Sequence, residues 1–165
     1  MYTICLVEDE MNLNQLIKTY LEKASYKVIQ VFNGEDALKY LNSDIHLWIL
    51  DIMLSDSVSG YDLIKKIREH NSSVPVIFTS ARDQDIDKII GLEMGSDDYI
   101  TKPYSPKELV LRVNNIIKRA YSISNEKIHY ECYDIDIERR IVYKDEVEVS
   151  LTTLEFDLLL MFLNH

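Results

Sequence analysis

Short apolar runs rich in β-branched residues alternate with stretches of helical period over the first 120 residues. The apolar runs lie at 3–7, 27–31, 47–50, 75–78 and 98–101, and the helical stretches at 11–23, 35–41, 61–70, 84–94 and 106–120. Five strands that are each followed by a helix predict an α/β fold, a five-stranded, doubly wound parallel sheet with helices on both faces. Ser105 as a cap and Pro106 in the first turn mark the start of the last helix.

The chain after residue 120 follows a different pattern. Short alternating segments predict the strands of a small antiparallel sheet, at 133–137, 141–143 and 147–149. The last two flank 144–146, which predicts a hairpin although this turn lacks the usual Gly. Thr152 and Glu155 form a capping box at the start of a helix that is apolar nearly all round. We therefore expect a partial small antiparallel sheet followed by one helix.

The two parts also differ in composition. Residues 1–120 contain 14 Lys and Arg against 18 Asp and Glu, whereas residues 121–165 contain 4 against 10. Every Gly and Pro of the chain lies within the first 120 residues. Together with the polar stretch YSISNE, this shift predicts one domain at 1–120, a linker at 121–126 and a second, smaller unit at 127–165.

Charge and apolar content exclude several classes of protein. A net charge of −10 disfavours non-specific binding to nucleic acid or to an anionic membrane. The longest apolar run, 158–163, is too short to span a bilayer, and the acidic start at Glu8, Asp9 and Glu10 does not suit a signal peptide. Cys5 and Cys132 are too far apart in sequence for a metal or redox motif. We therefore expect a cytoplasmic protein without membrane contact.

Charged and hydroxyl side chains follow the predicted strands where each strand ends. They are Glu8 and Asp9 after the first strand, Asp51 after the third, Thr79 and Ser80 after the fourth, and Lys102 after the fifth. Because the carboxyl ends of parallel strands lie at one edge of the sheet, these groups should meet in one crevice. Clustered carboxylates repel one another and need a cation, and hard oxygen ligands suit Mg²⁺ better than Zn²⁺.

This set of groups favours phosphoryl transfer. A carboxylate beside Mg²⁺ and a Lys can attack a phosphoryl group and form an aspartyl phosphate. Lys102 would neutralise charge on the transferring oxygens, and a strand-end hydroxyl would hydrogen-bond one of them.

A resemblance to a known family covers residues 1–120 and includes these strand-end positions. The matching segments are LVEDE (6–10), LDIML (50–54), TSAR (79–82) and GSDDYITKPYSPKEL (95–109). In these segments the sequence resembles the receiver domains of bacterial two-component response regulators, whose fold is flavodoxin- or CheY-like. The last segment and LTTLEF (151–156) are similar to the OmpR/PhoB subfamily.

The resemblance implies roles for the strand-end residues. Asp51 would be the phosphoacceptor, and Lys102 would be the family's lysine, followed by a cis bond to Pro103. The Mg²⁺ ligands would be the carboxylates of Glu8, Asp9 and Asp51 with the carbonyl of Met53. The chain would thus be a phosphoacceptor rather than an enzyme acting on a separate substrate.

The resemblance also implies a switch. Ser80 matches the family's hydroxyl better than Thr79, and only one of two successive strand side chains can point at the phosphoryl group. Tyr99 matches the switch aromatic. The face formed by the fourth helix, fifth strand and fifth helix would form a two-fold dimer, with Lys88 pairing with Glu108 and Asp98 with Arg112. The charged residues of that face are Lys88, Asp97, Asp98, Glu108, Arg112 and Arg119.

Partners follow from the same resemblance. A sensor histidine kinase would donate the phosphoryl group. Residues 127–165 resemble the N-terminal part of a winged-helix DNA-binding effector domain, without its recognition helix and wing, so only a full-length form would bind promoter DNA. The apolar helix should therefore pack on the receiver, pair with another copy or remain exposed.

One departure from the family concerns the loop after Asp51. The family usually has Pro where Ser55 stands and Gly eight residues after the acceptor, whereas Gly60 is nine after it. The loop 55–59 should be one residue longer and less rigid, which would affect the lifetime of the phosphoryl group.

Other functions on a similar sheet fit less well. A flavodoxin-like carrier needs an uncharged phosphate loop where EDEMNLN stands, and a haloacid-dehalogenase-type phosphatase needs a second acid where Met53 stands. The alternative that remains is a phosphorylation-independent adaptor on a receiver fold.

Overall fold

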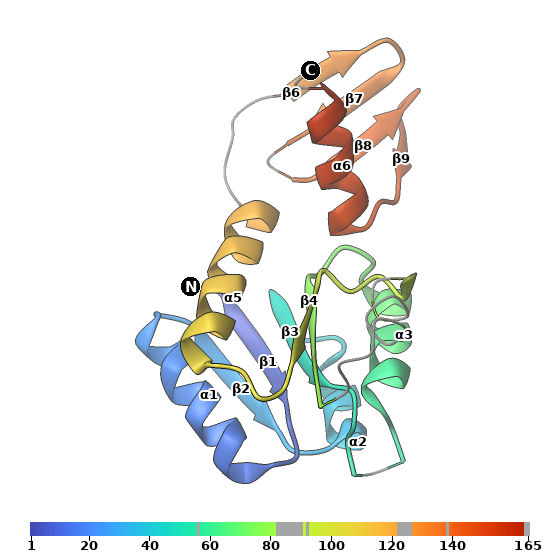
Figure 1. The fold of residues 1–165 in the computed structure, drawn as a ribbon. Helices are drawn as coiled ribbons and strands as arrows, with labels where there is room; N and C mark the ends of the chain where they lie inside the picture. The colour runs from blue at the N-terminus through green and yellow to red at the C-terminus, as the bar shows by residue number, and fades with distance from the viewer. Residues whose placement is uncertain (56, 82–90, 92, 122–126, 138, 164–165) are drawn as a thin grey trace.

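The computed structural model describes the chain except for residues 56, 82–90, 92, 122–126, 138 and 164–165 (Figure 1). The first part is a parallel sheet with strand order β2-β1-β3-β4-β5. Its strands are β1 (Thr3–Val7), β2 (Lys27–Val31), β3 (Leu47–Asp51), β4 (Val76–Ser80) and β5 (Asp98–Thr101). The predicted fold class, a doubly wound parallel sheet, is confirmed.

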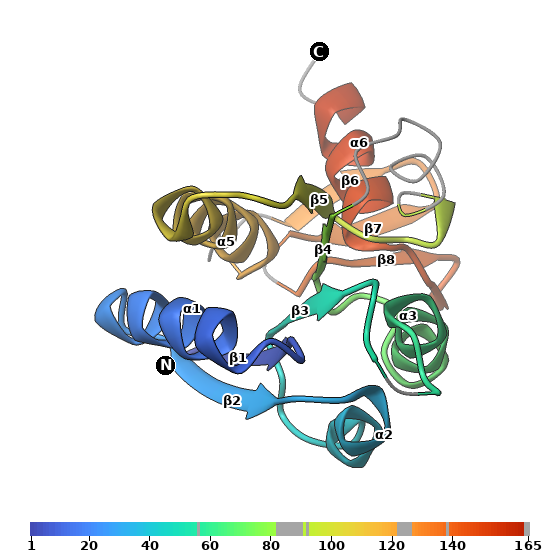
Figure 2. The same cartoon turned by 60° about the horizontal axis from the view of Figure 1, so that its bottom comes forward.

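Helices cover both faces of this sheet (Figure 2). They are α1 (Met11–Lys23), α2 (Gly34–Ala37) with a 3₁₀ turn at Leu38–Tyr40, α3 (Gly60–His70) and α5 (Pro106–Tyr121). Alternate strand residues face opposite ways. Ile4, Leu6 and Ile49 therefore pack with α1 and α5, while Cys5 and Leu50 pack with α3.

Most predicted boundaries agree with the structure, and the differences have local causes. The strand predicted at 75–78 runs from Val76 to Ser80, because Pro75 has no N–H for the ladder while Thr79 and Ser80 pair with β5. The helix predicted at 35–41 is a single α-turn that continues as a 3₁₀ turn. The helix predicted at 84–94 falls largely on residues outside those described.

The second part is a four-stranded antiparallel sheet with one helix packed on it (Figure 1). The strands are β6 (Lys127–Tyr130), β7 (Tyr133–Asp136), β8 (Ile141–Lys144) and β9 (Val147–Val149), followed by α6 (Thr153–Leu163). β6 was not predicted from the sequence. The predicted hairpin joins β8 to β9, and Asp145 and Glu146 adopt the positive φ angles (48° and 69°) that Gly usually supplies there.

The capping box of α6 is present, since the Thr152 N–H donates to Glu155 Oε2 (2.8 Å). Phe156 is buried on the sheet with Ile135 and Val142, while Met161 and Phe162 are exposed. An open apolar groove of about 720 Å³ lies between α6 and the sheet. Among the described residues, no helix is both long and apolar enough to cross a membrane.

Candidate functional site

The carboxyl ends of β1 and β3 bring three acids together. Parallel pairing places Val7 beside Leu50, so Glu8, which follows β1, and Asp51, the last residue of β3, lie at the same end of the sheet. A carboxylate oxygen from each of Glu8, Asp9 and Asp51 lies within 4.8 Å of the others. Such a cluster offers the oxygen ligands that Mg²⁺ prefers. The three acids predicted to share a crevice therefore do so.

Lys102, directly after β5, reaches into this cluster. Its Nζ lies 2.6 Å from Glu8 Oε2 and 2.6 Å from Asp51 Oδ2. The Lys102 ammonium thus bridges two carboxylates whose side chains are only 1% and 6% exposed. The peptide bond from Lys102 to Pro103 is cis, as predicted.

Burial dominates the electrostatics of this bridge. The pKa of Glu8 is raised to about 6, because desolvation by burial and the charge of Asp51 together outweigh the opposing hydrogen bond from Lys102. Burial lowers the pKa of Lys102, but the bonds to Asp51 and Glu8 outweigh this, so its pKa lies above the ordinary value. Lys102 is therefore a permanent cation in a pocket with excess negative charge.

The loop after Asp51 holds two of the acids through backbone N–H groups. The Met53 N–H donates to Asp51 Oδ1 (2.8 Å), and the Ser55 N–H donates to Asp9 Oδ2 (3.1 Å). Gly60 packs so closely that a Cβ there would lie 2.4 Å from the Asp51 carbonyl oxygen. The first residue of α3 must therefore be one without a side chain.

Asn14 positions the acid pair and was not predicted from the sequence. Its Nδ2 donates to the carbonyls of Glu8 (2.8 Å) and Val31 (3.1 Å), joining the ends of β1 and β2. Asn14 is fully buried beside Ile17 and Leu21 on α1. A polar residue on that apolar stripe was the signal that could have revealed it.

Comparisons with known proteins bear on this arrangement. The family model described as the response regulator receiver domain matches residues 4–114. The chain belongs to the response-regulator receiver family. It is 47% identical over 169 residues to the transcriptional regulatory protein CssR of Bacillus subtilis (strain 168), covering 99% of this chain and 75% of that protein.

Two further relatives extend beyond the receiver. The response regulator SaeR of Staphylococcus epidermidis is 37% identical over 160 residues, which cover 94% of this chain and 69% of that protein. The crystal structure of DrrB, an OmpR/PhoB homologue from Thermotoga maritima, has a TM-score of 0.68 and 29% identity over 98% of this chain and 71% of its own. The predicted relation to the OmpR/PhoB subfamily is confirmed.

The predicted switch residues of this receiver lie on β4 and β5. Ser80 is fully buried at the end of β4, where it pairs with Thr101 of β5. Thr79 pairs with Asp51 of β3, and its side chain points to the opposite face of the sheet from that of Ser80. Tyr99 is half-buried on β5 and packs against the core on the α3 side of the sheet.

Five of the charged residues predicted for a dimer face are described by the structure, and each has a charged partner within the chain. Arg112 lies 2.9 Å from Asp98 and 2.8 Å from Glu108. Lys88 lies outside the described residues. Asp97 has a side chain only 2% exposed and lies near Arg68 of α3, and Arg119 contacts Asp157 of α6.

Proposed function

We propose that this chain is the response regulator of a two-component phosphorelay in which Asp51 accepts a phosphoryl group from a sensor histidine kinase or a small phosphodonor. The observation that carries the proposal is the bridge of Lys102 between Glu8 and Asp51 beside Asp9. A purely structural salt bridge needs one acid, and three clustered acids call for a metal. The chain would work in the cytoplasm as a phosphoacceptor and not as an enzyme with a separate substrate.

The chemistry follows from the roles of the groups. Asp51 attacks phosphorus, the bond from phosphorus to the donor breaks, and the leaving group takes the electron pair. Mg²⁺ held by the carboxylates of Glu8, Asp9 and Asp51 and the Met53 carbonyl would supply positive charge against the phosphoryl oxygens. Lys102 would move from Asp51 to a phosphoryl oxygen.

The conformational response would involve Ser80, Tyr99 and the dimer face. The Ser80 hydroxyl would donate to the phosphoryl group, and Tyr99 would turn inward. The face around β5 and α5 would then pair two receivers, with Lys88 against Glu108 and Asp98 against Arg112. Residues 127–165 would be the N-terminal part of a winged-helix domain that controls transcription in a longer protein. The phosphorylation-independent adaptor is the competing function.

Acetyl phosphate treatment followed by intact-mass measurement tests the proposal. We expect one phosphoryl adduct in the presence of Mg²⁺ and at least about tenfold less in chelator. Asp9→Ala should raise the Mg²⁺ concentration needed for half-maximal adduct by about tenfold, because a direct ligand is lost. Equal adduct with Mg²⁺ and with chelator, or none in either, would favour the adaptor.

The Ser55 N–H gives a second prediction about the metal. It donates to a predicted ligand, Asp9, and a proline at this position would have no N–H to donate. Ser55→Pro should therefore tighten Mg²⁺ binding by about fivefold, since the ion no longer displaces a hydrogen bond. Ser55→Ala keeps the N–H and is the matched control. Calorimetric titration that finds the same affinity in both variants would contradict this role.

A further inference from the structure

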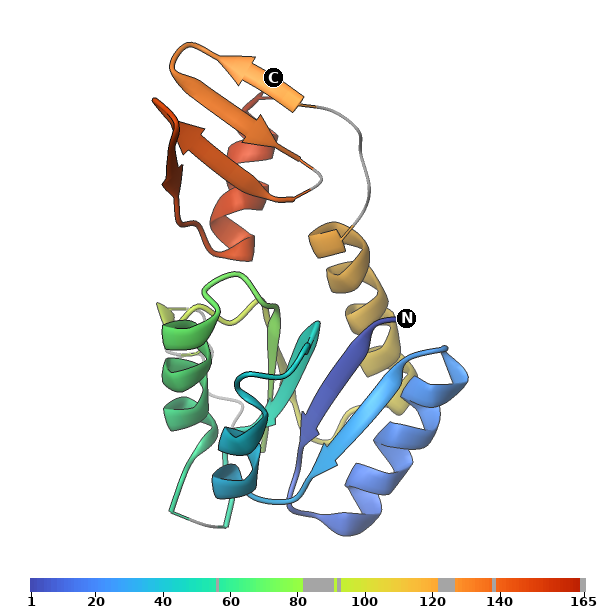
Figure 3. The same ribbon diagram turned by 180° about the vertical axis from the view of Figure 1, so that it is seen from behind.

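Four polar side chains of the phosphoacceptor site share one face of the receiver sheet. Each lies two residues after a member of the same core cluster: Glu8 after Leu6, Asp51 after Ile49, Thr79 after Ile77 and Lys102 after Ile100. Side chains two residues apart on a strand point to the same face. This face is covered by α1 and α5, and α3 covers the other (Figures 1 and 3). Thr79 therefore stands beside Asp51 on the α1 and α5 side.

A tyrosine hydroxyl is buried on the same side of the sheet. Tyr104 follows Pro103 of the cis peptide bond, and its ring packs against this core cluster. Its hydroxyl oxygen is buried and makes no hydrogen bond of good geometry within the part of the chain that the structure describes. Burial raises the pKa of Tyr104 most and the charge of Glu8 next, whereas the nearby Thr79 hydroxyl acts against them. The hydroxyl is therefore protonated and lies close to a carboxylate that can accept its proton in a hydrogen bond.

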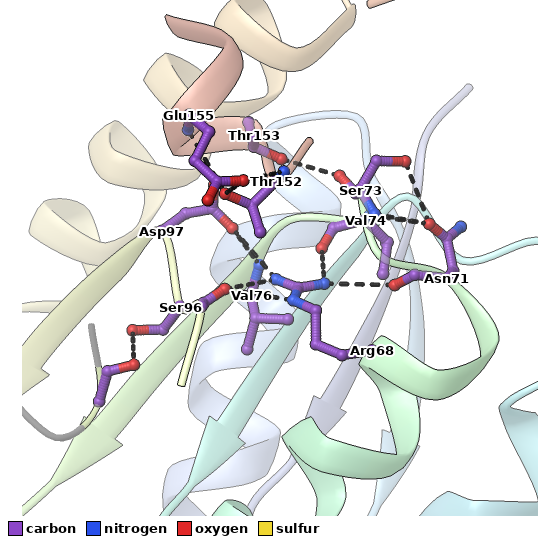
Figure 4. A network of polar contacts seen from close by, with 12 residues as sticks. Arg68, Asn71, Ser73, Val74, Val76, Ser96, Asp97, Thr152, Thr153 and Glu155 are labelled. Atoms are coloured by element: carbon purple, nitrogen blue, oxygen red, sulfur yellow. Dashed lines mark hydrogen bonds and ion pairs between the residues drawn. The ribbon is translucent and has the colours of Figure 1, made fainter. Parts of the chain in front are cut away.

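A second buried polar group, at the opposite end of the sheet, shows how such an atom is usually compensated. Asp97 Oδ1 also lacks a hydrogen bond among the described residues. Its Oδ2, however, accepts from the Val76 N–H (2.8 Å) and lies 3.6 Å from Arg68 Nη2 (Figure 4). A phenol has no second oxygen for this purpose. A buried hydroxyl without a partner destabilises the fold, which points to another state of the site in which Tyr104 has one.

Phosphoryl transfer supplies such a state, because it changes what the acids bind. In the structure, Lys102 donates to Glu8 Oε2 and to Asp51 Oδ2 (2.6 Å each). In the proposed function Lys102 moves to a phosphoryl oxygen, and it has room to move, since it lines an open pocket of about 410 Å³ together with Tyr104. The Glu8 side chain, only 1% exposed, then lacks its short hydrogen bond.

We propose that the Tyr104 hydroxyl is a positioning group of the phosphoacceptor site and donates to the Glu8 carboxylate when Lys102 leaves it for the phosphoryl group. The hydrogen bond keeps a buried metal ligand satisfied at the moment its ammonium partner departs. This role rests on the proposed function, since without phosphoryl transfer Lys102 stays on Glu8. A phenylalanine ring would fill the same space in the resting chain, so the hydroxyl serves the phosphorylated state alone.

Tyr104→Phe tests the role, because it removes the hydroxyl and keeps the ring. Calorimetric titration should show that Mg²⁺ alone binds as tightly as in the unchanged chain, since Lys102 still holds Glu8. With saturating Mg²⁺, the phosphoryl analogue beryllofluoride should bind about tenfold more weakly, because Glu8 then lacks a donor. The urea midpoint of the metal-free variant should be no lower than that of the unchanged chain, since no hydrogen bond is lost.

Tyr26→Phe is the matched control. Tyr26 belongs to the same core cluster, but its hydroxyl donates to Asn114 Oδ1 (2.6 Å). This variant should unfold at a lower urea concentration, because it loses that hydrogen bond. It should bind Mg²⁺ and beryllofluoride as the unchanged chain does.

Three results with Tyr104→Phe would overturn the role. They are an unchanged affinity for beryllofluoride, a loss of affinity for Mg²⁺ alone as large as the loss for beryllofluoride, and a lower urea midpoint in the metal-free chain. The last two would mean that the hydroxyl already has a partner before the phosphoryl group arrives. Beryllofluoride that fails to bind the unchanged chain would contradict the proposed function and this role together. A loss of binding confined to Tyr104→Phe supports both.

Discussion

Asp51→Asn is expected to lower phosphoryl uptake from acetyl phosphate by at least about a thousandfold, because an amide oxygen is a far weaker nucleophile than a carboxylate. The variant should still fold, since Lys102 keeps its bond to Glu8 and the amide oxygen introduced by the substitution can still accept from the Met53 N–H. Intact-mass measurement over the same time course gives the ratio of rates.

The control for Asp51→Asn is Asp44→Asn, an exposed acid in the loop before β3. That variant removes the same charge far from the cluster and should take up phosphoryl at the unchanged rate. An adduct that forms equally in Asp51→Asn would show that the phosphoryl group goes to another residue.

Lys102→Met is expected to destabilise the metal-free fold by about 3 kcal/mol near pH 8, the scale measured when one partner of a buried ion pair is removed. Glu8 and Asp51 would then face each other without a cation in a site with almost no exposure. Urea unfolding measures the loss. Lys66→Met is the matched control, because Lys66 is 54% exposed and its pair with Glu69 should contribute less than about 1 kcal/mol.

The destabilisation in Lys102→Met should depend on metal and pH. Mg²⁺ would replace the missing positive charge and restore part of the free energy of unfolding. Without Lys102 the pKa of Glu8 in the folded state rises further above its unfolded value, so the folded chain binds more protons and gains stability as the pH falls. A variant as stable as the unchanged chain at pH 8 without Mg²⁺ would contradict the proposed role of the bridge.

The receiver fold could be predicted because its central strands, β1, β3 and β4, are buried along their whole length and appear as short apolar runs. β1, β2 and β5 have the predicted bounds. β6 was missed, since Lys127–Tyr130 is short and polar and is a strand only because β7 pairs with it. The length of the α-helix predicted at 35–41 was overestimated, because its helical period continues through Leu38–Tyr40, which form a 3₁₀ turn.

The acid cluster could also be predicted, since parallel strands must end at one edge and residue types at their ends are visible in the sequence. Contacts made by backbone groups could not be predicted. The hydrogen bond from the Ser55 N–H to Asp9 is one of them. The link between Arg119 and Asp157 depends on how two separately folded parts meet, and no local pattern specifies that. Asp97 was accordingly assigned by resemblance to an outer face, although its side chain is buried.

The central claim is that the phosphoryl group is carried by Asp51 itself. Borohydride reduces an aspartyl phosphate to homoserine, so peptide mass spectrometry after treatment with acetyl phosphate and Mg²⁺ locates the modified residue. We predict homoserine at position 51, none at Asp9 or Asp44, no reduction of Glu8 to its alcohol, and no reduced residue anywhere when Mg²⁺ is chelated. Homoserine at another position, or an unmodified peptide around residue 51 in protein that carries the adduct, would contradict the account.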